Sequence, residues 1–86
     1  MRESKPKHLY VTIEDSYICN GHKITSYGIS VFSSEYNHIQ MIHRISEDYT
    51  SISNLVGLCN SLQLDPIHLY DVVDDFLYDI NRKQNT

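Results

Sequence analysis

Apolar and polar residues alternate in the first half of the chain, and apolar residues recur every three or four positions in the second half. Alternation is typical of a strand with one buried face, and the longer spacing is typical of an amphipathic helix. The pattern changes near Ile45. The 86 residues are therefore expected to form one α+β domain, residues 1–86, with the strands first and the helices after them.

Two alternating segments flank Asn20-Gly21, a typical hairpin sequence. A two-residue turn would place the apolar residues of the two segments on opposite faces. A three-residue loop, 19–21, would pair Ile18 with His22 and place both sets on one face. The pattern favours the longer loop with a bulge, although a bulge elsewhere would restore the shorter turn. The two sets are Leu9, Val11 and Ile13, and Tyr27, Ile29 and Val31.

A third alternating segment follows the polar loop 33–37. Pairing Val31 with Ile39 completes a three-stranded antiparallel meander over about residues 8–45, with the second strand in the centre. This register leaves three large side chains on the outer face of the sheet, where polar residues are normally found. We expect these residues to form a possible sheet-face interface, including one between two copies of the chain: Tyr10, Phe32 and Ile42.

Two helices are predicted after the sheet, over about 49–62 and 66–81, both packed on its apolar face in β-β-β-α-α order. Asp48 or Thr50 suits the start of the first helix, and Asp65-Pro66 is a strong start for the second. Gly57 lies inside the first helix, where we expect it to allow close approach of another backbone. The apolar stripes are Ile52, Leu55, Val56, Cys59 and Leu62, and Leu69, Val72, Val73, Phe76, Leu77 and Ile80.

Charge is distributed unevenly along the chain, whose net charge is −4. No Lys or Arg occurs from Ile45 to Ile80, a segment that holds seven acids. Glu47, Asp48 and Asp65 are explained by helix caps and dipoles. The remaining acids lie along one side of the second helix, with two tyrosines near them, and form either a solvated face or a docking surface for a basic partner: Asp71, Asp74, Asp75, Asp79, Tyr70 and Tyr78.

No motif in the sequence supports catalysis. There is no nucleophile elbow and no glycine-rich phosphate loop, and no four His, Cys or Asp residues have the spacing of a metal site. We therefore predict a protein that is not an enzyme and has no metal or cofactor. The acidic balance argues against direct binding to nucleic acid. Two widely spaced cysteines and the lack of a long apolar run predict a cytoplasmic protein with free thiols and no membrane segment.

Several short segments resemble a family of small uncharacterised proteins from Firmicutes, a domain of unknown function. The resemblance covers about Lys23 to Asp79 and implies a cytosolic bacterial origin compatible with a phage or other mobile element. It implies no activity. The segments that carry it are Tyr27-Gly28-Ile29, Ile45-Ser46, Cys59-Asn60, His68-Leu69 and the run from Asp71 to Leu77.

The sequence thus favours a small regulatory module that docks a basic protein, which could itself be bound to DNA, through the second helix. An alternative is an accessory factor of a mobile element, such as a recombination directionality factor that binds a serine integrase. Another is a phage anti-defence protein whose acidic side imitates phosphates.

Overall fold

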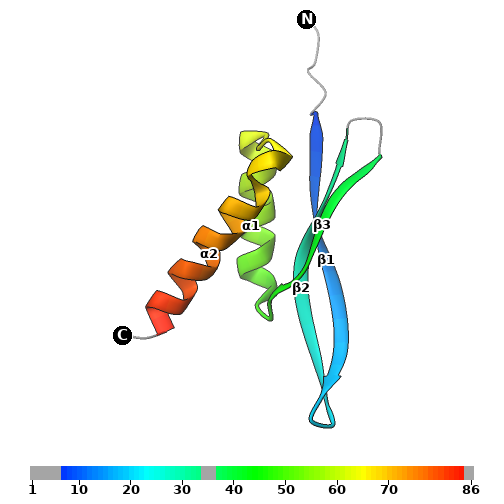
Figure 1. Ribbon diagram of the computed structural model, residues 1–86, viewed down its shortest axis with the longest axis vertical. Coiled ribbons are helices and arrows are strands. Elements are labelled where there is room, and N and C mark those ends of the chain that lie inside the picture. The colour runs from blue at the N-terminus through cyan, green and yellow to red at the C-terminus, as the bar shows by residue number, and fades with distance from the viewer. Residues whose placement is uncertain (1–6, 34–36, 85–86) are drawn as a thin grey trace, which may run out of the picture.

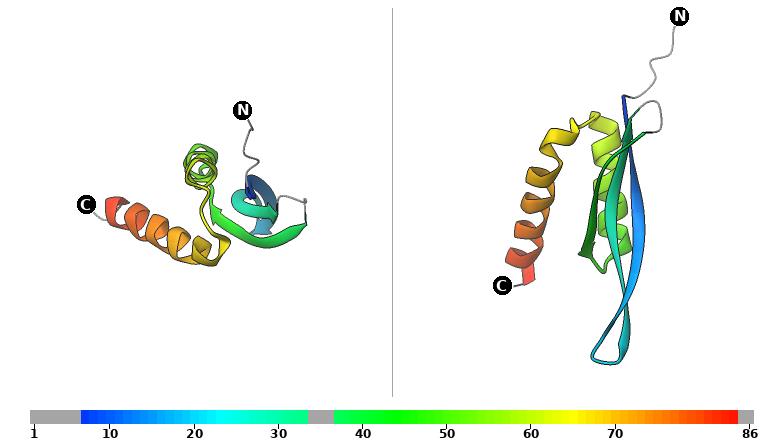
Figure 2. Two further views of the ribbon diagram at one scale, coloured as in Figure 1. Left: turned by 90° about the horizontal axis from the view of Figure 1, so that it is seen from above. Right: turned by 45° about the vertical axis from the view of Figure 1, so that its right-hand side comes forward.

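A computed structural model describes residues 7–33 and 37–84, with side chains as far as Ile80. Three strands, β1 (His8–Cys19), β2 (His22–Ser33) and β3 (His38–Ser46), form an antiparallel sheet in the order β1-β2-β3. Helix α1 (Tyr49–Leu62), the 3₁₀ turn η1 (Pro66–His68) and helix α2 (Leu69–Gln84) follow. Both helices lie on one side of the sheet and leave its other face uncovered (Figures 1 and 2). The predicted β-β-β-α-α order is confirmed.

The β1–β2 hairpin closes through a two-residue turn, so the predicted three-residue loop is wrong. Cys19 pairs with His22, and Asn20 and Gly21 have φ of 52° and 79°. Positive φ at both central positions belongs to the type I′ turn, whose twist matches that of the strands. Because the register is shifted by one residue from the predicted one, every β1 side chain lies on the opposite face.

Tyr10 is consequently a core residue, not an outer-face residue as predicted. It pairs with Val31 on the core face and is 1% exposed. Its hydroxyl donates a hydrogen bond to the carbonyl of Leu64, just beyond the end of α1. Leu9, Val11 and Ile13 instead alternate onto the uncovered face. A tyrosine replaces the predicted aliphatic residues in the core because its phenol oxygen has a partner there.

The register between β2 and β3 also differs from the prediction. Val31 pairs with Gln40 and Ile29 pairs with Ile42, one residue away from the expected partners in each case. Ile42 therefore packs against the core and does not lie on the outer face.

A bulge follows this pair, because β3 has three residues between Ile42 and Ser46 while β2 has Gly28 alone between the matching positions. Arg44 takes a φ of 55° in the bulge. A Cβ at Gly28 would lie 2.1 Å from the carbonyl oxygen of Ile42, so glycine is needed there. The bulge brings Ile45, 8% exposed, into the core.

The ends of the helices follow local sequence signals. Helix α1 spans the predicted residues, and its N-cap is Asp48, which accepts hydrogen bonds from the Thr50 N–H at 3.2 Å and the Ser51 hydroxyl at 2.5 Å. Gln63 ends the helix with a φ of 48°. Asp65 caps η1 as predicted, with Pro66 as its first residue. The second predicted helix, 66–81, is instead the turn η1 followed by α2, which continues to Gln84.

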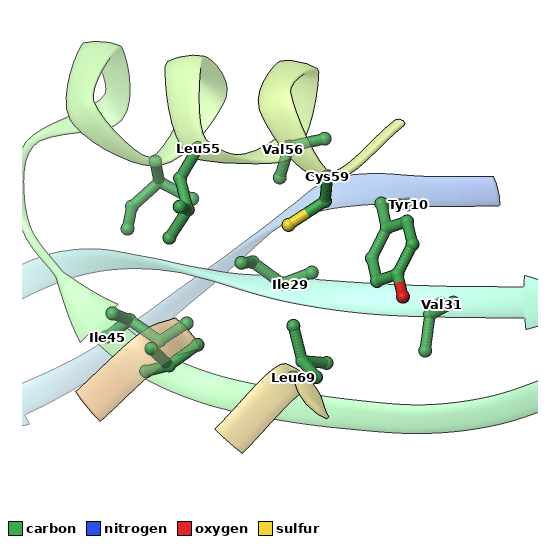
Figure 3. Packing of buried hydrophobic residues seen from close by; sticks show 10 residues of the cluster. Tyr10, Ile29, Val31, Ile45, Leu55, Val56, Cys59 and Leu69 are labelled. Carbon is green, nitrogen blue, oxygen red and sulfur yellow. The ribbon is translucent and has the colours of Figure 1, made fainter. Parts of the chain in front are cut away.

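The core lies between the sheet and the two helices (Figure 3). Helix α1 contributes four of the five predicted stripe residues, while α2 contributes Leu69 and Val73 from its first half. Leu62, the fifth residue predicted for the α1 stripe, is exposed. The buried apolar residues are Tyr10, Ile29, Val31, Ile45, Ile52, Leu55, Val56, Cys59, Leu69 and Val73.

Two side-chain amides at the end of α1 bind the free edge of β1. Asn60 accepts a hydrogen bond from the Tyr10 N–H and donates one to the Tyr10 carbonyl, both at 2.8 Å. Gln63 does the same at His8, accepting from its N–H at 3.2 Å and donating to its carbonyl at 3.1 Å. We call Asn60 and Gln63 the amide clamp. It supplies partners for edge groups that would otherwise be open to another strand.

Candidate interaction surfaces

The predicted acidic side of α2 is a real surface feature. Asp71, Asp75 and Asp79 are four residues apart and Asp74 directly precedes Asp75. All four are exposed, as are the tyrosines beside them. We call this set the acidic face: Asp71, Asp74, Asp75, Asp79, Tyr70 and Tyr78. Among the side chains that the structure describes, none of the four carboxylates takes part in an ion pair. Like charges at this spacing repel one another, and a basic partner would relieve that repulsion.

An apolar hollow of about 60 Å³ lies between α1 and the start of α2. Val72 contributes from α2, and the other lining residues come from α1 and the segment that follows it. Leu58 and Leu62, one turn apart, are 53% and 68% exposed. We call this the interhelical hollow, lined by Leu58, Cys59, Leu62, Leu64 and Val72.

The interhelical hollow and the acidic face share a border. Residues three and seven positions apart lie on one side of a helix, so Asp75 and Asp79 share a side of α2 with Val72. A ligand seated along the hollow would therefore have carboxylates beside it. Leu58 was not among the residues predicted to form this surface, and Leu62 was predicted to be buried in the α1 stripe but is exposed. The sequence signal for this surface was Leu58, an apolar residue of α1 that lies outside the predicted apolar stripe.

The uncovered sheet face is also apolar, but its residues are not those predicted. Phe32 alternates onto this face as expected, whereas Tyr10 and Ile42 lie on the core face. We call the observed set the outer sheet face: Leu9, Val11, Ile13, Ser30, Phe32 and Met41. The Asn-Gly turn was the signal that could have found it, because its preferred two-residue form specifies this register.

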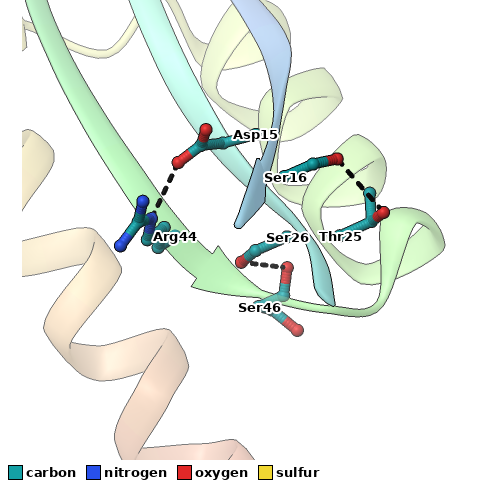
Figure 4. Close-up of polar contacts among 6 residues, drawn as sticks. All are labelled: Asp15, Ser16, Thr25, Ser26, Arg44 and Ser46. Atoms are coloured by element: carbon teal, nitrogen blue, oxygen red, sulfur yellow. Dashed lines mark hydrogen bonds and ion pairs between the residues drawn. The ribbon is translucent and has the colours of Figure 1, made fainter. Parts of the chain in front are cut away.

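One ion pair among the described residues borders the outer sheet face. Arg44 on β3 donates a hydrogen bond to Asp15 on β1 at 2.7 Å (Figure 4). Its guanidinium lies 4.2 Å from the ring centroid of Tyr17. The hydrogen bond from Arg44 lowers the pKa of Asp15. The two charges cancel, so the pair connects the edge strands without adding net charge.

The other shifted groups have structural roles. The hydrogen bond from Ser51 lowers the pKa of the capping Asp48 carboxyl. Burial raises the pKa of the Cys59 thiol, which makes the reactive thiolate rarer. Burial also raises the pKa of Tyr10 to about 12, with smaller contributions from Cys59 and Asp65. Across residues 7–33 and 37–84, no three His, Cys, Asp or Glu residues gather closely enough to hold a metal ion.

Comparison with known proteins places the chain in a family. A family of unknown function, DUF6514, matches residues 2–79. The chain belongs to this family. No curated protein and no solved structure matches it. The family description assigns no activity, so arguments about function rest on the surfaces described above.

Neither helix has the combination of length and apolar character needed to cross a bilayer, within the part of the chain that the structure describes.

Proposed function

We propose that this protein is a non-catalytic interaction module that binds a basic, amphipathic helical segment of another protein. The interhelical hollow takes one apolar side chain of that segment, and the acidic face meets its Lys and Arg residues. The observation that carries the proposal is the shared border of these two surfaces on α2. An acidic row alone would equally suit a solvated helix.

The size of the interhelical hollow favours a protein ligand. Small-molecule sites usually enclose roughly 300–1,000 Å³. A hollow of about 60 Å³ suits the end of one aliphatic side chain. The exposed ridge of Leu58 and Leu62 extends the apolar contact along α1. Apolar anchors spaced by one helical turn are typical of helix-in-groove recognition.

Charge supplies the specificity. The segment from Ile45 to Ile80 contains no Lys or Arg, so both helices present acidic or neutral side chains along that whole length. A partner with basic residues would relieve the repulsion among the aspartates and associate faster at low salt. An acidic partner would be rejected by the same field.

A peptide titration tests the proposal. The probe is a synthetic helical peptide with leucines one turn apart and lysines beside them, added to isotopically labelled protein and followed by NMR. We expect shifts at Leu58, Leu62, Val72, Asp75 and Asp79, and an affinity that falls as salt rises. A matched peptide with glutamates in place of lysines should bind at least about tenfold more weakly.

Two variants make the test specific. Changing Asp71, Asp74, Asp75 and Asp79 to Asn should reduce affinity for the lysine peptide by about tenfold or more. Changing Glu14 and Glu47 to Gln removes exposed acids elsewhere and should leave the affinity within about twofold. The proposal is overturned if the four-Asn variant binds as tightly as the wild type, or if the shifts map to other residues.

The compartment and origin are further parts of the proposal. Cys19 and Cys59 are both free thiols, one exposed and one buried, which suits a reducing bacterial cytoplasm. A mobile-element setting would be supported by a neighbouring recombinase or phage gene. Fractionation of cells that express the tagged protein would test the compartment.

A further inference from the structure

The outer sheet face is more apolar than a solvated sheet surface should be. Antiparallel sheets with helices on one side normally expose polar residues on the other. Here Leu9 and Met41 are 39% and 38% exposed, and Val11, Ile13 and Phe32 are half-buried. Ser30, between Val11 and Met41 in the register, is 1% exposed, so the neighbouring side chains close over the middle strand.

Charge identifies what can cover this face. The chain carries a net charge of −4, and the four exposed aspartates of the acidic face lie on the helix side. Two copies that met through α2 would bring these carboxylates together. Among the described side chains, the outer sheet face has no Asp, Glu, Lys or Arg apart from Asp15 and Arg44 at its border, which neutralise each other. His38 packs against Phe32 on this face, with ring centroids 5.3 Å apart. The outer sheet face is therefore a surface through which two acidic copies can meet without repulsion.

The area of the sheet limits how much surface two copies can bury in that contact. Strands of 12, 12 and 9 residues, at about 3.3 Å by 4.8 Å per residue, give the whole sheet roughly 500 Å² on each side, which is an upper bound for the contact. Two copies stacked face to face would bury at most about 1,000 Å² in total, which is small for a specific interface. Stacked sheets align at about −30°, which a twofold axis lying between the two sheets and parallel to them allows.

We infer that the outer sheet face is the interface of a weak homodimer in which the two sheets pack face to face. The contact is isologous, with Met41 and Leu9 of each copy at the interface. Both acidic faces then remain on the outside of the dimer, together with both interhelical hollows. Dimerisation through the sheet does not require that either of these surfaces binds a partner.

Sedimentation of the full chain tests the dimer. We expect the wild type to change from monomer to dimer between about 10 µM and 1 mM. Met41→Glu should weaken dimerisation by about tenfold or more, because it places a carboxylate in the apolar contact. Ile67→Glu is the matched control, because Ile67 is 77% exposed on η1, on the helix side. It should stay within about twofold of the wild type.

A second measurement needs no variant. Hydrogen peroxide converts exposed methionine to its sulfoxide. Met41 should oxidise more slowly at about 1 mM protein than at about 10 µM, because the dimer covers it. A wild type that remains monomeric at about 1 mM would overturn the inference, as would a dimer in which Met41 oxidises at an unchanged rate.

Discussion

The two helices lie on the same side of the sheet, but they are held in different ways. Helix α1 buries four residues and binds the edge of β1 through the amide clamp of Asn60 and Gln63. Helix α2 buries Leu69 and Val73 in its first half, and from Asp74 to Ile80 it has no buried residue. In Figure 1, α2 diverges from α1 toward its C-terminal end.

This difference indicates that α1 stabilises the fold, whereas α2 carries the residues available to a partner. Helix α1 and β1 secure each other through apolar packing and paired backbone groups. Helix α2 is anchored at one end, and its remaining length carries exposed acids and tyrosines. Loosely held elements with few buried contacts are those that can adjust to a partner. The comparison predicts that substitutions near α1 cost stability, whereas substitutions along α2 change binding.

The largest effect is expected for Ile52→Ala in α1. Ile52 is fully buried, so its truncation should lower the free energy of unfolding by about 2–5 kcal/mol. Leu77→Ala in the half-buried part of α2 should cost about half as much or less. Urea denaturation of both variants measures the two values. Equal losses would show that α2 is as firmly packed as α1.

Asn60→Ala should remove one arm of the amide clamp. Two backbone groups of Tyr10 lose their partners, and we expect a loss of about 1–3 kcal/mol. Asn54 is exposed in the same helix, so Asn54→Ala should change stability by about 0.5 kcal/mol or less. Hydrogen exchange at the Tyr10 amide should accelerate in the first variant and not in the second. Unchanged exchange in both variants would argue against the clamp.

Tyr10→Phe should cost about 1 kcal/mol at neutral pH, because the Leu64 carbonyl loses its donor. The pH profile is more specific. Folded Tyr10 has a pKa of about 12, against 10.0 for an unperturbed tyrosine. Between these values the unfolded chain binds fewer protons, so wild-type stability falls as pH rises from 10 to 12. This part of the decline should be absent from Tyr10→Phe and retained in Tyr70→Phe, since Tyr70 is exposed.

Gly57→Ala should give the smallest change, a gain of about 0.5–1 kcal/mol. The predicted close approach of another backbone is wrong: a Cβ at Gly57 would meet no atom within 4 Å. Alanine should therefore raise the melting temperature. Gly28→Ala is the contrasting variant, since its Cβ would clash with the Ile42 carbonyl, and it should destabilise the sheet. A gain at Gly28 or a loss at Gly57 would contradict this assignment.

The sequence predicted the elements well and the faces of the sheet poorly. Caps act within a few residues, so Asp48 located the start of α1 and Asp65 located the start of η1, which leads into α2. The predicted register is wrong because β1 has large apolar residues on both faces, whereas the prediction requires one polar face. In fact, Tyr10 lies on the core face while Leu9 and Val11 lie on the outer face. An alternating pattern cannot choose between two faces when both contain large apolar residues.

Local sequence therefore determined the order of strands and helices, their ends and the position of the acidic row, because these depend on short-range backbone and capping preferences. The tertiary structure decided which β1 side chains enter the core. Tyr10 is selected by a hydrogen bond to Leu64, 54 residues away, and by the amide of Asn60, 50 residues away. It also created the interhelical hollow and the outer sheet face. Both surfaces arise from contacts between segments that are distant in the sequence, and local sequence patterns do not predict such contacts.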